Sequence, residues 1–375
     1  MSPPPALDPE GPSKTTHQIL AGDARTLKGV PRESCDLVVT SPPYPMVEMW
    51  DATFRALRPE IGEALDREDG AAAFALMHEE LDRAWRACHR ALKPGGITCV
   101  NVGDAVRTVG GEFRLFSNHA RILAAAAKIG FTPLPDILWR KPTNAPNKFL
   151  GSGMLPAGAY VTYEHEYVLI FRKGPPRAFA GEEARLRRRS AFFWEERNVW
   201  FSDVWMGIAG AAQDLPGSAG RVRSGAFPFE IPYRLIQMFS LHGDAVLDPF
   251  AGTGTTLAAA ASSGRSSIGV EIDASLRDVA AAALEFAPRL GARRAEERLR
   301  AHRAFVAERE KAGKPPRHAN RRYGFPVVTR QEEDLVLVCP RSIRQTAPGT
   351  FEAEIGAVEE AALAVSELPP AGPAR

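Results

Sequence analysis

Short apolar runs alternate with helix-like segments along much of the chain. Strand-like runs occur at residues 17–20 (HQIL), 37–39 (LVV) and 97–102 (ITCVNV). Residues 71–92, between the second and third runs, place apolar side chains at helical spacing, and residues 118–129 do the same after the third. This alternation predicts an α/β protein, with a doubly wound, mostly parallel sheet and helices on both faces.

The alternation is lost between about residues 141 and 230 and returns with a strand, a glycine turn and a helix. We expect these parts in chain order: a flexible, proline-rich arm (1–16), one half of the α/β domain (17–140), a variable region (141–225), the other half of the domain (226–290), and a helical extension with a tail (291–375). The pattern assigns no role to the last part.

Composition narrows the possible functions. The 375 residues are 45% hydrophobic and 25% charged, as in ordinary globular proteins, and the formal net charge is only +2. Affinity for nucleic acid must therefore come from a local basic patch. The cysteines form no CxxC pair, so we expect no zinc site. The absence of a secretory leader and of long apolar runs predicts a cytoplasmic protein without a membrane partner.

The segment AVLDPFAGTGTTLAAA (245–260) is the strongest ligand-binding signal. It joins an apolar strand, a turn with Gly252 and Gly254, and a helix start whose free N–H groups favour an anionic group. Glu271 ends the next apolar run, where nucleotide-binding α/β folds place a carboxylate for ribose hydroxyls. No lysine follows the second glycine, so this is not a Walker loop. S-adenosylmethionine, with a ribose and a carboxylate, fits this pattern; a plain strand–helix turn is the alternative.

The segment TSPPY (40–44) follows the 37–39 run directly. Its prolines cannot donate to a sheet, so they either end a strand or provide a rigid backbone with unclaimed acceptors beside an aromatic ring. TSPPY and DPFAGTGTT together resemble the S-adenosylmethionine-dependent amino-group DNA methyltransferases, and their order is similar to that of the family's beta class. The flanking segments GDA (22–24), LKPGG (92–96) and GVEID (269–273) add to the resemblance, which covers about residues 17–280.

The resemblance implies a Rossmann-like methyltransferase fold in which 17–140 is the catalytic half, 141–225 an inserted target-recognition region and 226–290 the cofactor-binding half. It implies that the catalytic residues are Ser41, Pro42, Pro43 and Tyr44. It implies that the cofactor is bound by Asp23, Ala24, Thr40, Asp248, Pro249, Phe250, Gly252, Gly254, Thr255, Thr256, Glu271 and Ile272. The end of the 37–39 strand and the turn at 252–254 must then line the same side of the molecule.

Some of these roles have ordinary structural alternatives. The resemblance implies that Asp23 bonds the adenine amino group of the cofactor, whereas the alternative is a turn-forming aspartate. It implies that Phe250 packs against the cofactor, whereas the alternative is simple core packing.

The SPPY residues suit methyl transfer to an exocyclic amine, a poor nucleophile because its lone pair is delocalised into the ring. The Ser41 hydroxyl and the first proline's carbonyl can accept the amine hydrogens, and Tyr44 offers a face to an extruded base. In the family, Ser before PPY mostly accompanies cytosine-N4 methylation, and Asp or Asn accompanies adenine-N6 methylation. Cytosine N4 is therefore our hypothesis, with adenine N6 as the alternative.

Basic side chains in the variable region are candidates for DNA phosphate contacts. These candidates are Arg140, Lys141, Arg185, Arg187, Arg188 and Arg189, although a solvated charged face is the alternative.

We expect double-stranded DNA as the substrate, base flipping, no metal and a restriction-modification setting. An RNA or free-nucleobase substrate and a catalytically silent DNA-binding protein on the same fold are the alternatives. A homodimer and a separately acting cognate restriction endonuclease stay open as partners.

Overall fold

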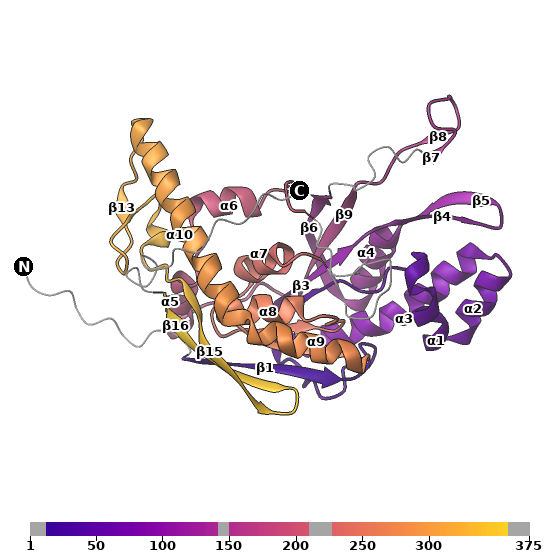
Figure 1. Ribbon diagram of the computed structural model, residues 1–375, viewed down its shortest axis with the longest axis horizontal. Helices are drawn as coiled ribbons and strands as arrows, with labels where there is room; N and C mark the ends of the chain where they lie inside the picture. The colour runs from indigo at the N-terminus through magenta and orange to yellow at the C-terminus, as the bar shows by residue number, and fades with distance from the viewer. Residues whose placement is uncertain (1–12, 142–149, 210–226, 359–375) are drawn as a thin grey trace, which may run out of the picture.

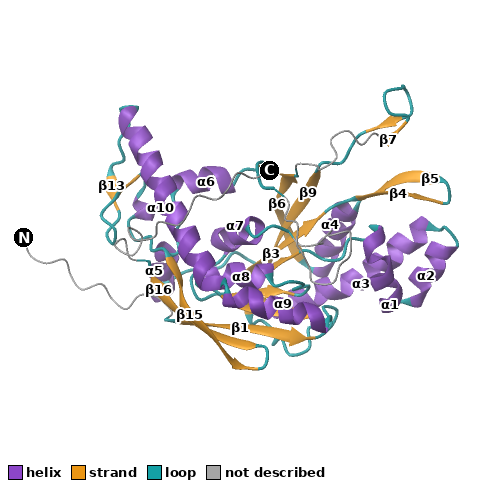
Figure 2. Ribbon diagram, in the orientation of Figure 1, coloured by secondary structure: helices purple, strands orange, loops and turns teal. Residues whose placement is uncertain are grey.

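The computed structural model describes residues 13–141, 150–209 and 227–358. Within them, ten strands form one sheet (Figures 1 and 2). Their spatial order is β10 (Val204–Trp205), β6 (Phe131–Arg140), β9 (His165–Lys173), β3 (Leu92–Val102), β2 (Cys35–Thr40), β11 (Ala245–Asp248), β12 (Ser266–Glu271), β1 (Lys14–Ala21), β16 (Thr350–Ala357) and β15 (Val338–Ala347).

Helices cover both faces of this sheet. One face is covered by α1 (Asp51–Leu57), α2 (Pro59–Asp66), α3 (Gly70–Ala91) and α4 (Asn118–Ile129). The other is covered by α7 (Glu230–Phe239), α8 (Thr255–Ser262) and α9 (Ala274–Glu285), with α10 (Ala287–Lys311) against α8 and β15. The fold is therefore the predicted doubly wound α/β sheet, mostly parallel at its centre.

Burial on both faces explains the continuous apolar runs of the central strands. Val38 and Val100 pack in the core cluster beneath α3, whereas Leu37 and Val39 pack with α7 and α8 on the other side. The two predicted helices of the first half form as expected. The Asp69 carboxylate accepts the N–H of Ala72 at 2.9 Å and caps α3, and Gly130 ends α4 with a φ of 110°.

The parallel strands define an edge that positions the site. We call this the carboxyl edge; it is formed by the last residues of β3, β2, β11, β12 and β1, namely Val102, Thr40, Asp248, Glu271 and Ala21. The opposite amino edge contains the first residues of the same strands. Because β9 runs antiparallel to β3, with Tyr167 opposite Val102, β9 begins at the carboxyl edge.

Shorter helices and strands lie outside the ten-stranded sheet and the helices that cover it. They are η1 (Glu48–Trp50), β4 (Ala105–Val109), β5 (Glu112–Phe116), β7 (Leu150–Gly151), β8 (Ala159–Tyr160), α5 (Gly181–Arg189), α6 (Trp194–Trp200), β13 (His318–Ala319), β14 (Pro326–Val327) and η2 (Arg330–Glu332). The β4–β5 and β7–β8 hairpins project on the same side of the molecule (Figure 1), and the rings of Phe113 and Tyr160 stack between them at 4.9 Å.

The structure corrects some expected boundaries. β1 begins at Lys14, so Lys14 to Thr16, expected in the arm, pair with β16 as sheet residues; residues 1–12 lie outside the described residues. KPGG (93–96) directly follows the end of α3 and lies within β3, next to a register shift between Cys35 and Leu37. The C-terminal extension joins the same sheet through β16 and β15, which could not be predicted from helix-like periodicity.

Candidate active site

The two sequence motifs meet at the carboxyl edge. The Thr40 hydroxyl, directly before SPPY, donates to the Asp248 carboxylate at 2.7 Å although 208 positions separate them. Thr256, in the first turn of α8, bonds the Val39 carbonyl at 3.4 Å. This proximity results from the pairing of β2 with β11. The end of β2 and the glycine turn therefore lie on the same side of the molecule, as expected from the sequence.

The glycine turn has the backbone that its sequence requires. Gly252 and Gly254 adopt φ values of 50° and 81°, which favour glycine. A Cβ on Gly252 would meet only the Phe250 carbonyl, at 3.8 Å, so space is open beside this backbone. A Cβ on Gly254 would lie 2.7 Å from the Ala280 Cα, so that glycine allows α9 to approach.

Glu271 is tied to the glycine turn. Its carboxylate accepts the N–H of Gly252 at 2.8 Å and the N–H of Asp273 at 2.9 Å. Ile272 follows with 64% of its surface exposed, an unusual position for a large apolar side chain. A carboxylate beside an exposed apolar surface and an open glycine turn can hold a ribose, an adenine and an anionic end. These residues therefore fit S-adenosylmethionine.

Asp248 is buried behind this turn. Burial raises the pKa of its carboxyl to about 6, even though hydrogen bonds from Thr40 and Thr256 oppose the shift. Pro249 follows it, and Phe250 packs edge-on against Trp85 at 6.1 Å between ring centroids. Phe250 thus already has a core partner, whereas its predicted contact with a cofactor stays a prediction.

Asp23 and Ala24 lie in the turn after β1, at the carboxyl edge. The Asp23 carboxylate is paired with Arg25 at 2.7 Å, and Arg25 also bonds Glu80. Burial alone would raise the pKa of Asp23, but the hydrogen bonds from Arg25 hold this pKa below its ordinary value. Asp23 is therefore an ionised acceptor in a fixed turn, a state compatible with either of the roles considered from the sequence.

Tyr44 is the centre of a polar network. Its hydroxyl lies 3.0 Å from the Ser41 hydroxyl and 2.9 Å from the Glu166 carboxylate. The Asn101 amide nitrogen donates to the Tyr44 hydroxyl at 2.9 Å and to Glu166 at 2.6 Å. Among the described residues, no backbone donor bonds the Pro42 carbonyl. The predicted roles of Ser41 and Pro42 as acceptors for a substrate amine stay predictions.

Sequence reasoning missed Asn101 and Glu166. Asn101 is at the end of β3 and Glu166 near the start of β9, and only the antiparallel pairing of these strands brings both to the carboxyl edge. The only sequence signal was polarity, since each is a buried polar residue beside an apolar run.

The predicted DNA contacts divide into two groups. Arg140 and Lys141 end β6 at the carboxyl edge, where Arg140 bonds Glu164 and Lys141 donates to Glu166 at 2.6 Å. The arginines of α5, which are Arg185, Arg187, Arg188 and Arg189, lie at the opposite, amino edge.

Contacts at both ends of α5 establish its position. Before it, Arg177 bonds Asp244 at 2.8 Å and approaches Asp36 at 3.6 Å, and both carboxylates lie at strand starts. After it, the Ser190 hydroxyl accepts the N–H of His242 at 2.9 Å. This position argues against the predicted phosphate role of the α5 arginines, because β9 carries the chain away from the catalytic motifs.

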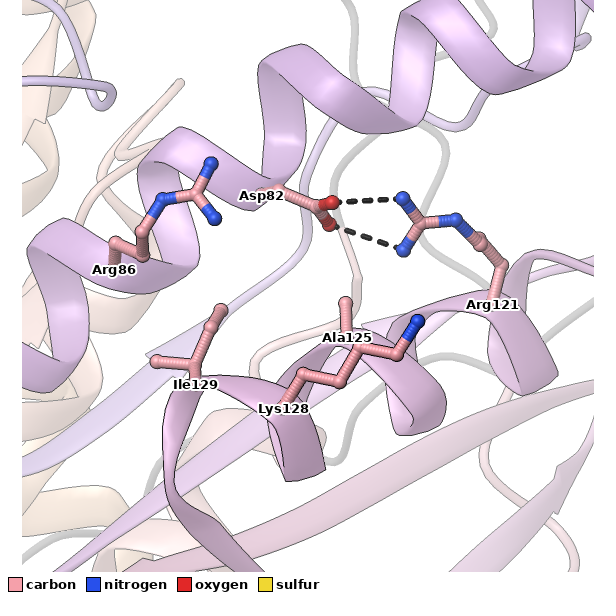
Figure 3. Close-up of a pocket in the computed structure, with 6 residues that line it drawn as sticks. All are labelled: Asp82, Arg86, Arg121, Ala125, Lys128 and Ile129. Atoms are coloured by element: carbon pink, nitrogen blue, oxygen red, sulfur yellow. Dashed lines mark hydrogen bonds and ion pairs between the residues drawn. The ribbon is translucent and has the colours of Figure 1, made fainter.

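A surface hollow elsewhere contains none of the motif residues. It lies between α3 and α4, where Asp82 and Arg121 pair at 2.7 Å beside Arg86 and Lys128 (Figure 3). In the described part of the chain, no cluster of histidine, cysteine or acidic side chains could hold a metal ion. None of the described helices combines the length and apolar character needed to cross a bilayer.

The fold and the site define a class: α/β enzymes that bind a nucleoside-bearing cofactor at the carboxyl edge, beside a proline-rigidified catalytic segment. Comparison with known proteins narrows this class. The DNA methylase family of N6 and N4 methyltransferases matches residues 35–282, and the chain belongs to this family.

Individual relatives agree with this assignment. The Type II methyltransferase M.MthZI of Methanothermobacter thermautotrophicus is 48% identical over 341 residues, which cover 90% of this chain and 95% of the relative. M.MjaI of Methanocaldococcus jannaschii, also a Type II methyltransferase, is 51% identical over 276 residues, or 71% of this chain and 90% of its own. The structure of TTHA0409 from Thermus thermophilus, complexed with S-adenosyl-L-methionine, is 35% identical, has a TM-score of 0.55, and matches over 72% of this chain and 96% of that one.

Proposed function

We propose that this DNA methyltransferase transfers a methyl group from S-adenosylmethionine to the N4 amine of a flipped cytosine in duplex DNA. The observation that supports cytosine is the acceptor at the first SPPY position. It is the hydroxyl of Ser41, not a carboxylate, held 3.0 Å from Tyr44. A neutral acceptor is weaker than a carboxylate, and it suits the more nucleophilic of the two amines.

The proposed chemistry needs acceptors rather than a strong base. The Ser41 hydroxyl oxygen and the Pro42 carbonyl accept the amine hydrogens, which localises the nitrogen lone pair for attack. The Tyr44 ring provides a stacking surface for the extruded base. When bound, S-adenosylmethionine supplies an electrophilic methyl group on its sulfonium, and the protein's task is in-line placement.

The cofactor-binding residues follow from the geometry of the glycine turn. We assign the ribose to Glu271, the adenine to Ile272 and Asp23, and the methionine end to the open backbone at Gly252 and the start of α8. The nearby Ala24, Thr40, Asp248, Pro249, Phe250, Gly254, Thr255 and Thr256 shape this site.

The order of the motifs supports assignment to the beta class. Residues 17–140 provide SPPY and 226–290 provide the glycine turn, so 141–225 is proposed as the target-recognition region. Parts of that region, 142–149 and 210–225, lie outside the described residues. Arg140 and Lys141, where the first half meets this region, are the proposed phosphate contacts, because they share the carboxyl edge with SPPY. The Type II names of the relatives are the support for a cognate restriction endonuclease; a homodimer remains a second open proposal.

The base is tested by expressing the protein in a host whose DNA lacks its own methylation. Nucleosides from a DNA digest are separated by mass, and modified positions are mapped at base resolution. We expect N4-methylcytosine at one recurrent site and none with Ser41→Ala. Only N6-methyladenine would overturn the choice of base, and no methylation at all would favour a silent DNA-binding protein.

A further inference from the structure

The polar network around Tyr44 includes a carboxylate that the proposed chemistry does not use. Glu166 is only 8% exposed, and Asn101 is 2% exposed. One Glu166 oxygen accepts hydrogen bonds from the Tyr44 hydroxyl and the Asn101 amide. The other accepts one from the Lys141 ammonium at 2.6 Å. A buried carboxylate that accepts from three donors is firmly held.

The chemistry of these groups gives each hydrogen bond a direction. A carboxylate can only accept, so the Tyr44 O–H points to Glu166 and both Asn101 amide hydrogens are used, one on Glu166 and one on Tyr44. Burial, reinforced by the charge of Glu166, raises the pKa of Tyr44 well above its ordinary value, so its proton stays in place.

These directions determine the state of Ser41. Because the Tyr44 proton is committed to Glu166, the 3.0 Å contact between the two hydroxyls can only be a donation from Ser41 to Tyr44. The Ser41 hydrogen then points away from the substrate side, and its lone pairs are left for an incoming amine. A Ser41 hydroxyl free to rotate would present its hydrogen to that amine for part of the time.

We propose that Glu166 is a positioning residue that, through Tyr44, fixes the Ser41 hydroxyl as a hydrogen-bond acceptor for the target amine. The inference rests on the acceptor role of Ser41 in the proposed function, and it holds for either base.

Tight packing leaves the network little freedom. A Cβ added at Gly103 would lie 3.2 Å from the Tyr44 ring and 3.3 Å from the Glu166 side chain. Lys141 binds the far oxygen of Glu166, so the carboxylate cannot turn without losing an ion pair. The arrangement is therefore pre-organised before any substrate arrives.

The decisive variant is Glu166→Gln, which keeps the shape and reverses one hydrogen bond. The Lys141 ammonium requires the amide oxygen, so the amide nitrogen faces Tyr44 and can only donate. The Tyr44 O–H is then left to donate to Ser41. We expect kcat to fall by about tenfold or more, the cost of losing one pre-organised polar group. Because Glu166 contacts none of the proposed cofactor-binding residues, Kd for S-adenosylmethionine should change by less than about threefold.

Controls separate positioning from folding. Glu33→Gln weakens another glutamate–lysine pair, with Lys173 at the far end of β9 and a more exposed glutamate, and should leave kcat unchanged. Tyr44→Phe keeps the ring and removes the relay, so Glu166→Gln added to it should cost no further activity. Transfer of a labelled methyl group to DNA is counted without regard to base, so a wrong choice of base does not affect the result.

Three results would overturn the inference: an unchanged kcat in Glu166→Gln, a loss that matches a lower unfolding midpoint and weaker cofactor binding, or effects of the two variants that multiply. If instead Ser41→Ala retains full activity, the acceptor role in the proposed function fails first, and the two failures are distinguished.

Discussion

At the scale of single residues, the buried Asp248 links the two motifs through hydrogen bonds and has an unusual ionisation. Its pKa is about 6, mainly because of burial. An acid whose pKa is higher in the folded state binds a proton that the unfolded chain has already released. Its contribution to stability is therefore full at low pH and is lost as the pH rises towards and through about 6.

Asp248→Asn should remove this pH dependence, because asparagine keeps an acceptor oxygen for Thr40 and the Phe250 N–H without ionising. The free energy of unfolding of the variant minus that of the wild type should increase by about 2 kcal/mol between about pH 4.5 and 7.5. Urea unfolding at several pH values measures it. Asp66→Asn, at an exposed site, should show no such growth, and a flat Asp248→Asn difference would contradict the prediction.

Some residues of the site could be predicted from the sequence and others could not. The positions of Ser41 and Glu271 at strand ends were predictable, because Ser41 follows β2 directly and Glu271 ends β12, each in a recognisable segment. Asn101 and Glu166 were not, because their roles depend on the antiparallel partner of β3. The pairing of Asp23 with Arg25 was likewise invisible to motif reading, although the two are neighbours in the chain.

At the scale of elements, the turn between β11 and α8 combines two different uses of glycine. Gly252 borders open space, whereas Gly254 lies against the backbone of α9. Both have positive φ, so any side chain costs about 1 kcal/mol in strain at either position. Only at Gly254 does a steric clash add to that cost.

Gly252→Ala should therefore mainly weaken cofactor binding, whereas Gly254→Ala should mainly lower stability. Gly252→Ala should lose about 1 kcal/mol of stability and bind S-adenosylmethionine at least about tenfold more weakly, because a methyl group occupies the space of the ligand. Gly254→Ala should lose about 2–4 kcal/mol, since α9 must move. Urea unfolding and calorimetric titration of the cofactor test both, and equal loss of stability in the two would refute this reading.

The position of α5 shows the limit of reading elements from sequence. Its arginines adjoin the recognition region in the chain, but β9 reverses direction and delivers them to the amino edge. Charge and neighbourhood in sequence suggested DNA contact, whereas strand direction decided the location. The α/β fold class was predicted correctly, because the periodicity of its strands and helices reflects burial, which is local to each element.

At the scale of the whole molecule, the sheet is completed by its C-terminal hairpin. β16 lies beside β1, and Phe351 is buried with Ile19, Leu257 and Leu284. Residues 291–375 had no predicted role because a strand that pairs with the opposite end of the chain leaves no local signal. Within the described residues of this extension, Phe351 of β16 is instead part of the core.

Phe351→Ala should lower the free energy of unfolding by about 3–5 kcal/mol, because it leaves a cavity at the junction of β1, α8 and α9. Urea unfolding measures the loss. Phe286→Ala, at a residue with 56% exposure, is the matched control and should change stability by less than about 0.5 kcal/mol. Comparable losses in the two variants would show that the hairpin is not part of the folding core.

The position of β1 between β12 and β16 also has a consequence for synthesis. His17 pairs with Ser267 on one side and with Phe351 on the other. During synthesis β1 emerges from the ribosome before β12 and β16. Its backbone N–H and C=O groups are therefore unpaired at first and can form incorrect pairings. Newborn chains should therefore depend on chaperones until β16 has emerged from the ribosome.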